Sequence, residues 1–234
     1  MNGYYGFDIT YLILVLPAIL LCTFAQAKVK STFSKYSSVV SRRGFTGRQA
    51  AELVLRMGGV SDVRITTVSG SLTDHYDPKS KVIRLSDPVY GSGSIAAIGV
   101  AAHEASHACQ HAEGYAPLTM RNAVVGLCNI GSQLSMPMIM LGIVLNFQVL
   151  TNLGIILFGL LTVFQVLTLP VEFNASRRAL QMLKQDYVLD EEELKATKKV
   201  LSAAALTYVG SMLVSLTQLL RLIILFGGRS RDDR

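Results

Sequence analysis

The stretch NAVVGLCNIGSQLSMPMIMLGIVLNFQVLTNLGIILFGLLTVFQVLTLPV, residues 122–171, has no Asp, Glu, Lys, Arg or His in fifty consecutive positions. A helix that crosses a hydrocarbon core of about 30 Å needs about 20 apolar residues. The stretch therefore predicts two membrane spans, at residues 128–146 and 150–169, with Asn146 and Gln148 marking the turn. A chain of 234 residues is too short to cover this apolar surface as a soluble core, so we expect an integral membrane protein.

Two other stretches have the same uncharged, apolar character. Residues 9–27 predict an N-terminal transmembrane anchor over residues 1–27. We expect this anchor to stay uncleaved, because its start lacks the basic region of a signal peptide. Residues 200–220 are uncharged too, but they include several hydroxyl-bearing side chains. We interpret residues 200–234 as an apolar C-terminal helix or membrane span with a charged tail, and a re-entrant hairpin is a further alternative.

Basic residues gather on one side of the predicted spans. They follow the first span and flank the 122–170 hairpin, at Lys28, Lys30, Lys35, Arg42, Arg43, Arg48, Arg121, Arg177, Arg178 and Lys184. Lys and Arg are enriched in the cytoplasmic segments of membrane proteins. We therefore expect residues 28–121 and 171–199 in the cytoplasm and the N-terminus outside.

The net charge bears on the binding partners of the chain, and the cysteines bear on whether it contains disulfide bonds. The net charge of +6 belongs mostly to the predicted cytoplasmic side and requires no nucleic acid, whereas the anionic surface of a lipid bilayer suits it. The three cysteines, Cys22, Cys109 and Cys128, lie in or beside apolar helices. An odd number of cysteines in such places argues against a disulfide framework.

The region 28–121 has mixed helix and strand patterns. Residues 46–57 predict a helix that Thr46 caps and Gly58 and Gly59 end. Short strands are expected at residues 63–68 and on both sides of a turn at 77–80. A further helix begins after Ser92 or Ser94 and ends at Gly114. The returning segment 171–199 is expected to be a helix that starts at Pro170, with a second start at Asp190.

The segment AAHEASHACQH, residues 101–111, contains candidate metal ligands and a candidate catalytic base. His103 and His107 are four residues apart, so on a helix both rings project from the same face. They could bind one zinc ion per chain while Glu104 lies beside it. The zinc would lower the pKa of a water molecule and polarise a carbonyl, and Glu104 would act as the general base. This is the H-E-x-x-H pattern of metallopeptidases.

A catalytic zinc of this class needs a third protein ligand, and the residues leave three candidates. His111 is one turn beyond His107, but three such rings would spread along about 12 Å of a straight helix. His75 lies in a predicted strand that could approach the site. Glu172 follows the third span, in LPVEFNASRRAL at residues 169–180.

At this point the sequence resembles a known family. An H-E-x-x-H helix followed by a membrane hairpin and a helix with a glutamate resembles the HtpX-like gluzincins and, more closely, the YugP-like neutral zinc metallopeptidases of bacterial membranes. The matching blocks are LTDHYDP at 72–78, KVIRLS at 81–86, SIAAIGVAAHEASHACQH at 94–111 and VEFNASRRAL at 171–180. With the spacing of the spans, the resemblance covers nearly the whole chain.

The resemblance implies a fold and a site. It implies a mostly α-helical integral membrane protein of the bacterial inner membrane, with a small α+β zincin-like catalytic domain in the cytoplasm. It also implies His103, His107 and Glu172 as zinc ligands and Glu104 as the base. HtpX-like proteins commonly have an Asp four residues after the ligand glutamate; Ser176 stands there, so the role of that Asp is not carried over.

Three other polar residues near the predicted site, His75, Gln110 and His111, each have two interpretations. His75 is a candidate catalytic residue that could donate to the developing oxyanion, or a hydrogen-bonded turn histidine. Gln110 and His111 are expected to face solvent or a neighbouring helix. The resemblance to gluzincins further implies that an extended substrate lies along the strand near residues 74–77, since exposed strand edges bind peptides by backbone pairing.

Three functions are compatible with these patterns. The leading hypothesis is a membrane-anchored zinc metalloendopeptidase whose substrates are peptides or proteins, unfolded and membrane proteins included. The second is an intramembrane, site-2-type metalloprotease, although only about eight apolar residues precede His103. The third is a non-catalytic zinc-stabilised membrane scaffold or regulator, for which Glu104 would have no purpose.

Overall fold

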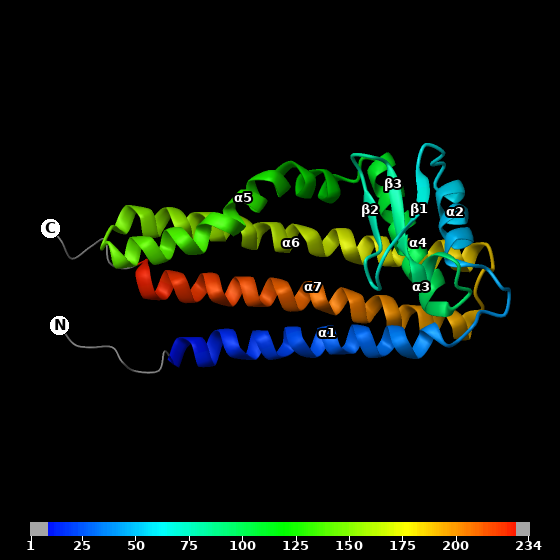
Figure 1. Cartoon of the computed structure of the whole chain (residues 1–234), viewed down its shortest axis with the longest axis horizontal. Coiled ribbons are helices and arrows are strands. Elements are labelled where there is room, and N and C mark those ends of the chain that lie inside the picture. Colours follow the sequence, from blue (N-terminus) through cyan, green and yellow to red (C-terminus); the bar gives the residue numbers. More distant parts are fainter. Residues whose placement is uncertain (1–8, 228–234) are drawn as a thin grey trace. The chain divides into compact units, whose positions relative to one another are not determined.

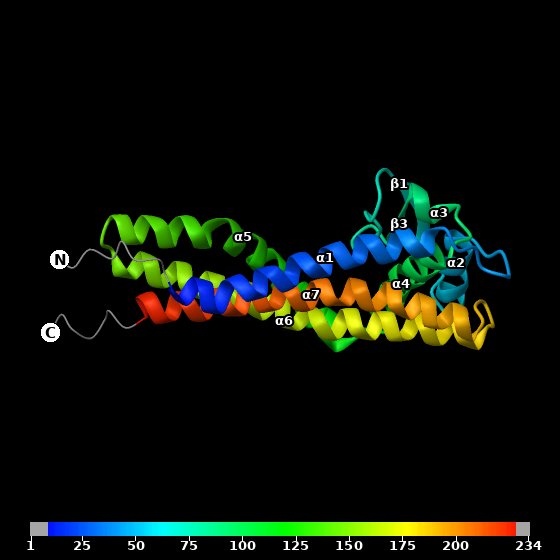
Figure 2. The same cartoon turned by 90° about the horizontal axis from the view of Figure 1, so that it is seen from below.

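The structure of the protein, a computed structural model, describes residues 9–227 (Figures 1 and 2). The chain forms two compact units. Of the described residues, the first comprises 9–24, Met120–Thr168 and 208–227, and the second comprises Ala25–Thr119 and Leu169–Thr207. The start of the predicted anchor and the charged C-terminal tail, residues 1–8 and 228–234, lie outside the described residues. The assignment of the pieces 1–27, 28–121, 122–170, 171–199 and 200–234 to membrane and cytoplasm stays a prediction.

The part of the chain that the structure describes contains four helices long and apolar enough to cross a membrane. They are Tyr11–Ser37 (the π-helical turn η1, Tyr11–Val15, continued by α1, Leu16–Ser37), α5 (Ala116–Val144), α6 (Gln148–Gln185) and α7 (Glu191–Phe226). In the most apolar 18 residues of each helix, at most 28% is buried inside the structure. Exposing so many large apolar side chains to water would cost free energy. These helices therefore need a lipid environment.

Two of these helices form the predicted hairpin in the first unit. The turn between α5 and α6 lies at Asn146, whose φ of 51° is in the left-handed region that Asn tolerates. Gly154 of α6 lies so close to α5 that a Cβ there would come within 2.8 Å of the Ser135 carbonyl oxygen. The absence of a side chain at Gly154 thus allows the two helices to pack closely.

The helix after the hairpin differs from the prediction. The sequence predicts a new helix at Pro170, but α6 continues through this proline. Val171, Ala175 and Ala179 are fully buried at four-residue spacing beyond it. Burial of this stripe outweighs the one backbone hydrogen bond that a proline removes. Likewise α7 is one unbroken helix, which excludes the re-entrant hairpin.

The second unit contains the predicted capped helix. α2, Gly47–Met57, begins after Thr46, whose hydroxyl accepts from the Gln49 amide while the Gln49 side chain accepts from the Thr46 amide. This reciprocal pair is a capping box. Gly58 ends the helix, and Gly59 has a φ of 67° that suits glycine.

A small mixed sheet lies in the same unit. Its strands are β1 (Arg64–Val68), β2 (His75–Asp77) and β3 (Val82–Ser86), in the order β1-β3-β2. β1 is parallel to β3, and β2 is antiparallel to it. The predicted turn between β2 and β3 is closed by Asp77, which accepts from the Lys79 amide and the Ser80 hydroxyl.

The central helix of the second unit is α4, Ile95–Ala112, which follows the short α3, Asp87–Tyr90. Of the two predicted caps, Ser94 is the one used, because its hydroxyl accepts from the Ala97 amide. Small residues cover most of its buried surface, namely Ala96, Ala97, Gly99, Ala101, Ala102, Ala105 and Ala108. The fold is thus mostly helical with a small three-stranded sheet, and α4 is packed where its polar face can carry a site.

Candidate metal centre

Three of the predicted site residues lie on α4. His103 and His107 are one turn apart, with ring centroids 4.7 Å from each other in an edge-to-face arrangement. Ala105 and Ser106, which lie between them, are fully buried, whereas the two histidines and Glu104 are partly exposed. The helix therefore packs through its small residues and turns the face with these three side chains away from the core.

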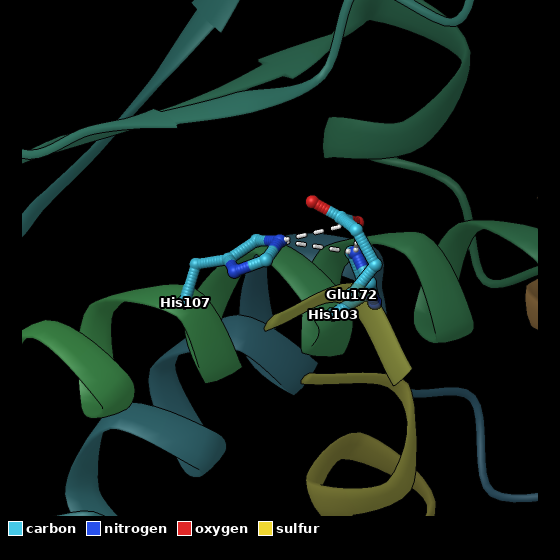
Figure 3. A group of neighbouring side chains, drawn as sticks. All are labelled: His103, His107 and Glu172. Atoms are coloured by element: carbon cyan, nitrogen blue, oxygen red, sulfur yellow. Dashed lines mark hydrogen bonds and ion pairs between the residues drawn. The ribbon is translucent and has the colours of Figure 1, made fainter. Parts of the chain in front are cut away.

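Glu172 meets the two histidines from α6 (Figure 3). One of its carboxylate oxygens, Oε2, lies 3.3 Å from Nε2 of His103 and 3.7 Å from Nε2 of His107. The two Nε2 atoms are 3.2 Å apart. Glu172 itself is only 4% exposed, and the preceding Val171 is fully buried, so the packing of α6 directs the carboxylate.

The positions of these three ligand atoms fit a metal ion. They all lie within 4.8 Å of one another. Ligands about 2.0–2.1 Å from a tetrahedral zinc ion lie about 3.3 Å from each other, close to the 3.2–3.7 Å separations found here. Two imidazole nitrogens and a carboxylate oxygen are also donors that zinc prefers. A single cation would satisfy these three electron-rich atoms at once.

The second ring nitrogen of each histidine also has a partner. Nδ1 of His107 lies 2.9 Å from Oε1 of Gln110, and Nδ1 of His103 lies 3.2 Å from the Ser176 hydroxyl. A proton on Nδ1 that is donated to these oxygens leaves the Nε2 lone pair free for a metal. The sequence had carried over no role for Ser176, and the structure places it directly behind His103.

Gln110 is fully buried and faces the neighbouring helix α6, which is one of the two alternatives expected for it. Its amide nitrogen donates to the Val171 carbonyl oxygen and to Oδ1 of Asn174, each at 2.9 Å. Asn174 in turn accepts from the Arg178 guanidinium at 2.8 Å. Gln110 therefore joins the His107 ring on α4 to the turn of α6 that carries Glu172. The sequence held a signal for this, since Gln110 is three residues beyond His107 on one helix face.

Burial and the neighbouring charges shift the pKa of His107 in opposite directions. Burial by itself lowers the pKa of His107, but the carboxylates of Glu172 and Glu104 and the hydrogen bond with Gln110 raise it above the usual histidine value. A metal ion must displace a proton to use this nitrogen. Zinc and protons are therefore expected to compete at His107.

His75 does not join this group. It is exposed on β2, and its Nδ1 lies 2.8 Å from the Thr73 carbonyl oxygen. Successive side chains of a strand point to opposite faces, and it is the next residue, Tyr76, that reaches α4. The Tyr76 hydroxyl lies 2.8 Å from Nδ1 of His111. A catalytic role for His75 thus stays a prediction, and His111 pairs with Tyr76 rather than joining the three clustered side chains.

The environment of Tyr76 favours its protonated form. Burial of the ring and the nearby charges of Asp62 and Asp77 raise its pKa. Hydrogen bonds from Ser80 and the backbone outweigh partial desolvation and lower the pKa of Asp77 to about 2, so this charge is permanent at neutral pH. Tyr76 therefore remains a neutral hydroxyl beside α4.

Comparisons with known proteins agree with this geometry. The sequence model of a family described as "Putative neutral zinc metallopeptidase" matches residues 11–227. The chain is 46% identical over 223 residues to "Putative membrane protease YugP" of Bacillus subtilis (strain 168), covering 95% of this chain and 99% of that protein. No solved structure matches the chain significantly.

Proposed function

The chain belongs to the neutral zinc metallopeptidase family, and on this premise we propose that it is a membrane-anchored zinc endopeptidase that hydrolyses peptide bonds. The observation that carries the proposal is the meeting of His103, His107 and Glu172 at metal-binding distances on the helix face that also presents Glu104. A zinc site with a structural role alone needs no carboxylate base beside it.

The proposed chemistry assigns one task to each residue. His103, His107 and Glu172 would hold the zinc, with His103 and His107 oriented by Ser176 and Gln110. When bound, the metal supplies the Lewis acidity that activates a water molecule and a carbonyl group. Glu104 takes a proton from the attacking water and passes it to the leaving amine as the C–N bond breaks. The products are one peptide with a new carboxylate and one with a new amine.

The sheet supports a peptide or protein as the substrate. β2 lies at one end of the order β1-β3-β2 and pairs only with β3 among the described strands. An extended peptide can pair with such an edge through its backbone. Because Tyr76 of β2 contacts His111 of α4, a chain bound there would run beside the helix that carries Glu104.

The proposed location is the bacterial inner membrane, crossed several times, with the active site on the cytoplasmic side. The long apolar helices and the membrane protease relative support a membrane location, and the distribution of basic residues supports the orientation. Cleavage inside the bilayer is disfavoured, because α4 is not among the four described helices that could span a membrane.

The test compares the purified wild type with Glu104→Gln in detergent, for bound zinc and for cleavage of an unfolded model protein. We expect about one zinc per chain in both proteins, cleavage by the wild type, and a loss of activity of at least about a hundredfold in the variant. Chelation of zinc should abolish cleavage by the wild type, and added zinc should restore it.

A matched control is Glu52→Gln, which removes an exposed carboxylate of α2 that pairs with Arg48. It is expected to retain both zinc and activity. If the wild type and Glu104→Gln bind zinc equally and neither cleaves, the chain is a zinc-stabilised scaffold. Absence of zinc from both proteins would refute the ligand assignment.

A further inference from the structure

A pocket of about 610 Å³ lies between α1 and α7 within the second unit. One face of each helix lines it, with Lys28, Ser31, Thr32, Lys35 and Tyr36 from α1 and Lys199, Ser202, Ala203 and Leu206 from α7. Steps of three and four residues place such side chains on one helix face. The second half of α1 and the first half of α7 lie side by side in both views (Figures 1 and 2).

The lining of this pocket is cationic. It contains three lysines and no carboxylate. All three lysines are exposed, and within residues 9–227 none of them forms an ion pair with an acidic side chain. Thr32 and Ser202 add hydroxyl groups that can donate hydrogen bonds, whereas the Ser31 hydroxyl donates to the Lys28 carbonyl oxygen. Ammonium and hydroxyl donors around one cavity are suited to a phosphate group.

The position of the lysines along each helix points to the origin of the phosphate. Lys28 comes directly after the uncharged run 9–27, and Lys199 comes directly before the uncharged run 200–220. Both runs belong to helices that could span a membrane. The polar end of such a run is where lipid headgroups lie.

We propose that the pocket lined by Lys28, Lys35 and Lys199 is a binding site for the phosphate of an anionic phospholipid headgroup. The phosphate would contact the three ammonium groups and the hydroxyls of Thr32 and Ser202. This inference is independent of peptidase activity, because none of the pocket residues belongs to the metal centre. A soluble phosphate ester shares the chemistry, and the test separates the two sources.

The test measures lipid binding to the purified full-length protein in neutral detergent by native mass spectrometry. Phosphatidylglycerol and phosphatidylcholine with identical acyl chains are titrated in parallel, and inorganic phosphate is added as a competitor. The wild type is expected to bind phosphatidylglycerol more tightly. Replacing Lys28, Lys35 and Lys199 together by Gln should remove this preference, with a loss of about fivefold for each lysine near a membrane surface.

The matched control replaces Lys30, Lys195 and Lys198 by Gln. These three lysines are exposed on the same helices and do not line the pocket. The control removes the same net charge and should retain the preference for phosphatidylglycerol. If the pocket variant does not fold, Ser202→Phe fills the pocket without changing any charge, and it should weaken phosphatidylglycerol binding in the same way.

The outcomes are distinct. Equal losses in the pocket variant and the control would overturn the proposal, because binding would then depend on total charge. A wild type that does not distinguish the two lipids and does not respond to phosphate would overturn it as well. Equal displacement of both lipids by inorganic phosphate would overturn the choice of an anionic lipid, because phosphatidylcholine carries the same phosphate group as phosphatidylglycerol. A protein that binds inorganic phosphate and neither lipid would overturn the lipid source and assign the site to a soluble phosphate.

Discussion

Gln110 makes three hydrogen bonds although it has no exposed surface. Its Oε1 meets Nδ1 of His107, and its amide nitrogen donates to the Val171 carbonyl oxygen and to Asn174. A buried amide is tolerated only when its polar atoms are paired. Here the pairing also orients the His107 ring toward Glu172. Loss of this one side chain should therefore affect metal binding as well as stability.

Gln110→Met retains the approximate size of the side chain and removes all three hydrogen bonds. We expect zinc affinity to fall about 10–100-fold, as it does when a group that orients a metal-binding histidine is lost. We also expect the free energy of unfolding to fall by about 1–3 kcal/mol, because Val171 and Asn174 lose a buried partner. Zinc titration against a competing chelator measures the first effect, and thermal unfolding measures the second.

The control for this variant is Gln181→Met, which makes the same replacement at an exposed position of α6. It should change neither quantity. A Gln110→Met protein with unaltered zinc affinity would show that the hydrogen bond to His107 has no part in positioning the metal.

At the scale of the elements, α4 approaches α7 more closely than a side chain would allow. A Cβ added at Gly99 would lie 2.7 Å from Cγ2 of Thr197. Thr197 is fully buried, and its hydroxyl donates to the Glu193 carbonyl oxygen at 2.9 Å, which fixes its rotamer. The methyl group of Thr197 therefore has no free space to move into.

Gly99→Ala should lower the free energy of unfolding by about 1 kcal/mol. The clash costs about 1–3 kcal/mol, and the higher helix propensity of alanine returns about 1 kcal/mol. Adding Thr197→Ser removes the methyl group but retains the hydroxyl, so the sign should reverse. The double variant is expected to be more stable than Thr197→Ser alone, as followed by denaturation in detergent.

The element boundaries show where local patterns suffice. The cap at Thr46, a cap at Ser92 or Ser94 and the turn at residues 77–80 were all predicted, because each depends on residues within four positions of one another. The start of a helix at Pro170 was wrong for the opposite reason. Continuation of α6 depends on the burial of Val171 and its neighbours against the rest of the unit, which a local rule for proline does not include.

At the scale of the whole molecule, the proposed orientation places the end of α1 in the cytoplasm and the turn between α5 and α6 outside. Ser38→Cys and Leu145→Cys put a thiol at exposed positions in these two places. In spheroplasts of a bacterial host, an impermeant maleimide should label Leu145→Cys directly. It should label Ser38→Cys only after the membrane is permeabilised.

The unsubstituted protein is the control for this labelling, since Cys109 and Cys128 are buried and Cys22 is half-buried. The reverse pattern would place the metal centre outside the cell. Equal labelling of both sites in intact spheroplasts would mean that the intervening chain does not separate the two sides of the membrane as proposed.

The sequence alone determined the features that depend on short spacing or on composition. Uncharged runs of twenty residues or more indicated a membrane protein, because the thickness of the hydrocarbon core sets the length of a span. The four-residue step from His103 to His107 placed both rings on one face, because a helix repeats every 3.6 residues. The resemblance carried by the sequence blocks also pointed to Glu172.

Tertiary structure decided which distant residues meet. The sequence left His75, His111 and Glu172 open by spacing alone, and packing of α6 on α4 brings Glu172 to the histidine pair while Tyr76 engages His111. The partners Gln110 and Ser176, and the lysine pocket between α1 and α7, arise in the same way. Periodicity describes only the face of one helix, whereas the contact between two faces depends on the burial of all the residues around them.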